Sequence, residues 1–139
     1  MKMDLKPSVE LLESYSKELG EFCIVDEFSV KEKQLKAPLI KHLFVGRLIR
    51  HRMLGSKLRS EKERLISKLT AAAVTESPVK VDARKVSEAA NKNEKVVEIS
   101  EMIYYNNHII DYLEKVEKIL SSFTYDIKNI VEIMKLETT

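Results

Sequence analysis

Residues 109–134 read IIDYLEKVEKILSSFTYDIKNIVEIM, and their apolar pattern is the strongest structural signal in the sequence. Its apolar side chains recur at alternating steps of four and three, the heptad spacing that places them along one edge of an α-helix. The positions at this spacing, called the seam below, are Ile109, Leu113, Val116, Leu120, Phe123, Ile127, Ile130 and Met134. Further apolar residues widen the stripe, which favours a bundle or ring of several helices over a two-stranded coiled coil.

A single helix cannot bury such a seam against itself. We expect other copies of the chain to cover it, so that the seam joins the subunits of a homo-oligomer. Packing against the rest of the same chain is the alternative. Continued toward the N-terminus, the same spacing reaches Asn106. A buried Asn fixes the register of packed helices at a cost in stability; the alternative is that Asn106 faces solvent.

The first part of the chain also predicts helices, because the sequence has only 3 Gly and 3 Pro in 139 residues. A short helix is expected to begin at Pro7 and to end at Gly20, with an irregular connection over residues 21–29. A second helical stretch runs from Val30 to Ala73, and Pro38 is expected to break or kink it.

Gly46 and Gly55 weaken this central helix and mark either a bend or a close approach. Ser77-Pro78 is a turn signal, so residues 74–83 are expected to form a linker. The stretch that follows has neither Gly nor Pro and predicts a long helix to Leu136, either continuous or broken near Asn106 or near Ser122. The sequence therefore predicts an all-α protein. Its expected parts are an N-terminal helical region with the basic helix (1–73), the linker (74–83) and a C-terminal helical oligomerisation region (84–139).

The charge is distributed unevenly. The formal net charge is only +2, yet residues 31–68 carry 12 basic and 3 acidic groups, whereas residues 1–30 carry 3 basic and 7 acidic groups. A nearly neutral chain thus contains a strongly basic helix.

Basic side chains of this helix recur at steps of 3, 7, 7 and 4, which puts five of them on one helical face, with three more to one side. Such a stripe can follow a phosphate backbone. The expected nucleic-acid-binding residues are Arg47, Arg50, Arg52, Lys57, Arg59, Lys62, Arg64 and Lys68. Phe44 is the only aromatic residue nearby, so electrostatic binding without sequence preference is expected rather than base stacking. A solvated face, or an amphipathic helix on an anionic membrane or protein, is the alternative.

The sequence contains no signature of catalysis, of a cofactor or of a metal site. Glycine-rich phosphate loops and nucleophile motifs are missing. His42 and His51 are interpreted as part of the basic helix, and His108 as a neighbour of the seam, without metal-ligand spacing. Cys23 is interpreted as a small buried apolar residue, compatible with a reducing cytosol. Neither a signal peptide nor a membrane span is expected.

Several of these segments resemble the UvsY family of recombination mediators from T-even-like bacteriophages. The matching residues are Tyr104-Tyr105, Ile109 to Glu114, Ile119-Leu120, Ile127-Lys128-Asn129 and Glu132, together with Val25-Asp26 and Leu35-Lys36-Ala37-Pro38. The resemblance implies a non-enzymatic hexameric or heptameric ring without cofactors, acting on DNA in the host cytoplasm. Its implied partners are single-stranded DNA, further copies of itself, a RecA-like recombinase and the phage single-stranded-DNA-binding protein that the recombinase replaces.

The resemblance also implies a DNA-binding motif of the form basic-x-basic-Leu in the central helix. Lys62-Glu63-Arg64-Leu65 matches it best, with Lys68-Leu69 close behind. The aromatic pair that follows in the family is missing here. Two further hypotheses remain: a coiled-coil adaptor that binds only proteins, and a double-stranded-DNA binder, for which no helix–turn–helix spacing is evident.

Overall fold

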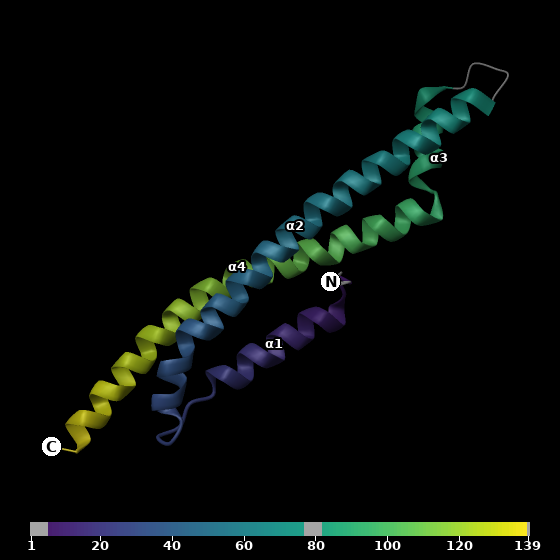
Figure 1. Ribbon diagram of the computed structural model, residues 1–139. Helices are drawn as coiled ribbons and strands as arrows, with labels where there is room; N and C mark the ends of the chain where they lie inside the picture. The colour runs from purple at the N-terminus through teal and green to yellow at the C-terminus, as the bar shows by residue number, and fades with distance from the viewer. Residues whose placement is uncertain (1–5, 77–81, 139) are drawn as a thin grey trace.

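The computed structural model describes residues 6–76 and 82–138, and within them the secondary structure is entirely helical. The helices are α1 (Val9–Cys23), α2 (Val30–Glu76), α3 (Ala83–Asn91) and α4 (Glu94–Glu137). Figure 1 shows α2 and α4 as two long rods side by side in opposite directions, with α1 beside the first half of α2. The end of α4 thus lies at the same end of the molecule as the α1–α2 connection. The all-α prediction is confirmed.

Helix α1 presents one apolar face to the two long helices. Ser8 caps its start by accepting a hydrogen bond from the backbone N–H of Leu11 at 3.2 Å. The prediction that the helix ends at Gly20 is wrong, because it continues to Cys23. The extra turn buries Phe22, whose ring lies 5.2 Å from that of Phe123 on α4, and this packing stabilises the longer helix.

Helix α2 runs through Pro38 without a break and ends at Glu76 rather than at Ala73. Pro38 lacks an N–H and therefore leaves one helical hydrogen bond unmade. The first turns of α2 accordingly bend relative to the rest of the rod (Figure 1). Ala37, beside the bend, is buried against the core.

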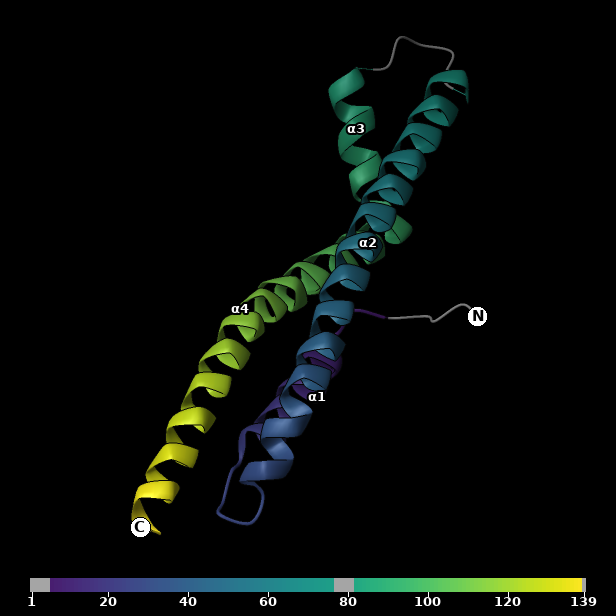
Figure 2. The same cartoon turned by 60° about the vertical axis from the view of Figure 1, so that its left-hand side comes forward.

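The C-terminal stretch forms two helices, α3 and α4, and it breaks neither near Asn106 nor near Ser122. The chain breaks between α3 and α4 because Asn93 caps the start of α4, accepting a hydrogen bond from the N–H of Lys95 at 3.0 Å. Asn competes well for this cap position. The break lets α3 fold back beside the end of α2 (Figure 2), where Val86 and Ala90 are buried. Of the expected linker 74–83, residues 74–76 and 83 are helical, and residues 77–81 lie outside the described part.

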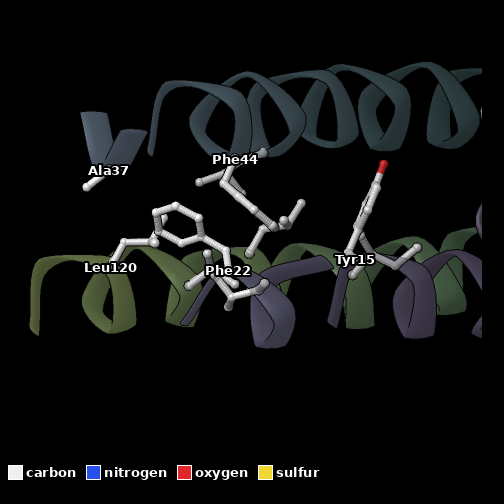
Figure 3. Close-up of a cluster of buried hydrophobic side chains, with 10 residues drawn as sticks. Tyr15, Phe22, Ala37, Phe44 and Leu120 are labelled. Carbon is white, nitrogen blue, oxygen red and sulfur yellow. The ribbon is translucent and has the colours of Figure 1, made fainter. Parts of the chain in front are cut away.

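The core lies between α1, α2 and α4, and most of the seam is inside it. Ile109 and Val116 are 0% exposed, and Leu120 is 2% exposed. Figure 3 shows Leu120 of α4 and Phe22 of α1 in one cluster of side chains between α4 and α2. The seam is therefore covered by the chain itself as far as Ile127, which is the alternative considered above, and these side chains are not available to join subunits in this conformation. Phe123 and Met134 are half-buried, and Ile130 is 37% exposed.

A buried polar network interrupts this apolar core and fixes how the helices meet. Asn106 and His51 are both 0% exposed. The amide of Asn106 pairs with Nδ1 of His51 at 2.8 Å and donates to the backbone carbonyl of His51 at 2.9 Å. The hydroxyl of Tyr15, which reaches from α1 toward α2 in Figure 3, lies 3.0 Å from Nε2 of His51. Side chains of α1, α2 and α4 thus satisfy one another's hydrogen-bonding groups, and Asn106 does not face solvent.

Gly55 is the position where α2 makes room for this network. A Cβ atom there would lie 3.0 Å from the amide nitrogen of Asn106, which its two hydrogen bonds to His51 hold in place. We expect Gly55→Ala to lower the free energy of unfolding by about 1–2 kcal/mol, because the crowded amide cannot move aside without losing a hydrogen bond. Urea denaturation measures this.

Gly20→Ala is the matched control. Gly20 is exposed within α1, and a Cβ atom there would meet nothing within 4 Å. Alanine favours the helix, so we expect this substitution to raise the free energy of unfolding by about 0.5–1 kcal/mol. Stabilisation by both substitutions would contradict the close approach at Gly55.

The burial of His51 makes stability depend on pH. Desolvation, together with the charges of Arg50 and Arg47, lowers the pKa of His51 below its ordinary value of about 6.5 despite the hydrogen bond that Nδ1 of His51 donates to the side-chain oxygen of Asn106. As the pH falls below about 6.5, the unfolded chain binds a proton at His51 while the folded chain does not, so the free energy of unfolding decreases. We expect this decrease between pH 7 and pH 5 in urea denaturation. It should persist in His42→Gln and disappear in His51→Gln; an equal decrease in both variants would contradict the assignment.

Candidate nucleic-acid interface

The side of α2 that points away from the core, called the outer face below, carries four exposed cations between Arg50 and Lys68. These cations, called the basic stripe, are Arg50, Lys57, Arg64 and Lys68, and all are exposed. Steps of seven, seven and four keep them on one side of the helix, roughly half a turn from the buried Leu48. Among the residues that the structure describes, none of the four has a carboxylate within ion-pair distance. Their charges are therefore available to an external anion.

Two exposed serines extend the stripe, and the charge pattern alone did not point to them. Ser60 and Ser67 lie between the cations on the outer face. Their hydroxyls can donate hydrogen bonds to phosphate oxygens. The spacing of three residues from Lys57 to Ser60, which places both on neighbouring positions of one helical face, could have identified Ser60 from the sequence. Glu61 is also exposed, within the stripe between Lys57 and Arg64, and lowers its net charge.

Arg47 was predicted to bind nucleic acid, but the structure places it between α1 and α2. Its guanidinium pairs with Glu18 at 2.8 Å and lies over the rings of Tyr15 and Phe44, at 4.5 and 4.9 Å from their centroids. The side chain is only 16% exposed. Cation–π contacts and a partly buried ion pair hold α1 on α2, so Arg47 is a structural residue.

The other predicted residues lie away from the outer face. Arg52 pairs with Glu114 of α4 at 2.9 Å, and Arg59 donates a hydrogen bond to Ser56 at 3.4 Å. Lys62 follows the buried Leu58 by one turn and is half-buried. The two cations of the motif Lys62-Glu63-Arg64-Leu65 therefore lie on different sides of α2, and only Arg64 belongs to the basic stripe.

Aromatic stacking has no platform on the basic stripe. Phe44, the one nearby candidate, is 3% exposed and packs in the core. Tyr104 is 59% exposed but lies on α4, where its ring meets His108 edge-on at 4.6 Å. The interface therefore offers cations and hydroxyls, which is the chemistry of phosphate contacts rather than of base recognition.

The described part of the chain holds no group of His, Cys, Asp or Glu side chains that could bind a metal ion. Within residues 6–76 and 82–138, no helix combines the length and the apolar character needed to cross a bilayer. Cys23 is half-buried, and burial raises the pKa of its thiol, as expected for a packed side chain.

Two crystal structures of the recombination mediator protein UvsY of bacteriophage T4 have a similar fold. They align with TM-scores of 0.74 and 0.71 at 12% sequence identity, over 91% and 92% of this chain and 98% of each UvsY chain. At this identity the likeness shows the fold. None of the curated proteins compared with the chain matches it.

A family model also matches the sequence, and it does so independently of the coordinates. The model is described as "Recombination, repair and ssDNA binding protein UvsY" and matches residues 25–139, which include all of α2, α3 and α4. The chain therefore belongs to the UvsY family of recombination, repair and single-stranded-DNA-binding proteins.

Proposed function

We propose that this chain is a recombination mediator that binds single-stranded DNA without sequence preference as a ring-shaped homo-oligomer. In this role it promotes loading of a RecA-like recombinase onto strands held by the phage single-stranded-DNA-binding protein, in the host cytoplasm. The observation that carries the DNA-binding part is the basic stripe, whose four cations are exposed, unpaired and aligned on one face of a rigid helix.

The dimensions of the stripe suit a single strand. At 1.5 Å per residue, Arg50 and Lys68 lie about 27 Å apart along the helix, long enough to follow several nucleotides. The cations contact phosphates, which every sequence presents, so no sequence preference is expected. A row of cations contacts phosphates of both single-stranded and duplex DNA. A flexible single strand can adapt its phosphate spacing to the row, whereas a stiff duplex cannot, so we expect a preference for the single strand.

Assembly would multiply the effect of each stripe. One stripe supplies few contacts and binds weakly by itself. Several stripes repeated by symmetry engage one strand together, and the effective concentration of each additional contact is high. A ring of such subunits can therefore bind long strands firmly and exchange short segments quickly, which suits a protein that hands DNA to a recombinase.

A fluorescence anisotropy titration with labelled oligo-dT, and with a duplex of the same length, tests the proposal. We expect tighter binding of oligo-dT, with the logarithm of affinity falling by about 0.7 per neutralised phosphate for each unit in the logarithm of salt concentration. Absence of binding at low salt would reject the proposal and support the protein-only adaptor. Preference for the duplex would support the double-stranded-DNA binder.

A further inference from the structure

The first half of the outer face of α2 is apolar, and the sequence pattern did not draw attention to it. Leu35, Leu39, Ile49 and Met53 are 69%, 70%, 52% and 68% exposed. With His42 and Gly46 between them they follow steps of 4-3-4-3-4, the spacing of a packed helical seam. These four residues, called the apolar stripe, lie half a turn from Phe44 and Leu48, which face the core. Helix α2 therefore has two opposite apolar faces, and the chain covers only one.

A second exposed apolar surface lies on α4, at the same end of the molecule. Ile119 and Ile133 lie on one flank of α4, roughly a quarter to a third of a turn from the buried seam, and are 43% and 54% exposed. Ile133 also lines a hollow together with Val25 and Val30. A monomer rarely leaves clustered apolar side chains of this size exposed.

The charges around the two surfaces are of opposite sign. Residues 30–53 of α2 carry 7 basic and 1 acidic groups, whereas residues 111–137 of α4 carry 4 basic and 6 acidic groups. Asp126 and Glu137 are exposed on the same flank of α4 as Ile119 and Ile133. Apposing the two surfaces would therefore be favoured both by apolar burial and by electrostatic complementarity, whereas apposing two apolar stripes would bring like charges together.

We propose that the apolar stripe on α2 of one copy docks on this flank of α4 of a second copy. Such a contact joins two different surfaces, so each copy keeps one surface of each kind free. Contacts of this type propagate from copy to copy and close into a ring when the rotation permits. The basic stripe continues the apolar stripe along α2, so docking would place the cations of each subunit next to the contact between subunits. The inference deepens the proposed function by naming the surfaces that join the subunits.

Paired glutamine substitutions test this docking without changing charge. Leu39→Gln with Ile49→Gln (the α2 variant) removes one surface, and Ile119→Gln with Ile133→Gln (the α4 variant) removes the other. Val74→Gln with Val97→Gln is the matched control, since both valines are exposed, at 61% and 42%, outside the two surfaces. Mass photometry should show multi-subunit assemblies for the wild-type protein and the control. Each of the two variants should need at least tenfold higher concentration to assemble, with unchanged helical circular dichroism.

Mixing the two variants gives the decisive outcome. Each variant retains the surface that the other lacks, so the mixture should form dimers of one copy of each and stop there. Assembly of the α4 variant like wild type would overturn the proposal in favour of an α2–α2 contact, and a monomeric wild-type protein would overturn it outright. The slope of oligo-dT affinity with salt, measured per bound chain, reports separately on the basic stripe. A normal assembly without DNA binding would reject the proposed function and leave the docking intact.

Discussion

Replacing Asn106 by alanine should lower the free energy of unfolding by about 2–4 kcal/mol, the largest stability effect that we expect from a single polar residue here. Asn106 is fully buried and makes hydrogen bonds of 2.8 and 2.9 Å to the ring and to the backbone of His51. Alanine leaves the buried ring nitrogen of His51 without its partner and opens a small void beside Gly55. Urea denaturation followed by circular dichroism measures the loss.

Asn107→Ala is the control for this substitution. Asn107 is the next residue of α4 but is exposed, so its replacement should change stability by no more than about 0.5 kcal/mol. A loss below about 1 kcal/mol in Asn106→Ala would mean that the network contributes little net stability, because an unsatisfied buried partner costs at least that much.

Replacing the four cations of the basic stripe by glutamine should remove most of the affinity for single-stranded DNA. If each cation neutralises one phosphate, the slope of log affinity against log salt becomes shallower by about 2.8. That slope corresponds to a roughly fifty-fold fall in affinity between 50 and 200 mM salt, which the variant should no longer show. Anisotropy titrations with labelled oligo-dT at several salt concentrations measure both quantities.

A charge-matched control separates the basic stripe from net charge. Four exposed cations of α3, of the α3–α4 turn and of the start of α4 can be replaced by glutamine instead: Arg84, Lys85, Lys92 and Lys95. Because these lie outside the outer face of α2, we expect a slope close to that of the wild-type protein. Equal losses in the two variants would show that binding follows total charge and not the stripe.

The helical class and the seam could be predicted because periodicity and a shortage of Gly and Pro are local properties. Which helices bury the seam could not be predicted. Heptad spacing says that a helix edge is buried, but α1 and α2 bury Ile109 and Leu120 in the same way as a second subunit would. The break at Asn93 was missed for a related reason. No Gly or Pro marks it, and the cap is decided by the packing of α3 on α2.

The candidate site was predicted in part, because helical spacing orders side chains around an axis without showing which side faces the core. The step of three from Arg47 to Arg50 suggested one surface. Arg47, however, lies against Tyr15 and Glu18 of α1, a helix whose position the local sequence of α2 does not reveal. His51 was interpreted as one more basic residue for the same reason. Its partner Asn106 is distant in sequence, and only tertiary structure brings them together.

Photo-crosslinking of the intact protein to an oligo-dT strand that contains 4-thiothymidine, followed by peptide mapping, locates the bound DNA on the protein. We expect the crosslinked residues to concentrate on the outer face of α2 between Arg50 and Lys68, and their yield to fall as salt increases. Crosslinks confined to α1 or α3, or no crosslinks at low salt, would show that DNA does not bind the basic stripe.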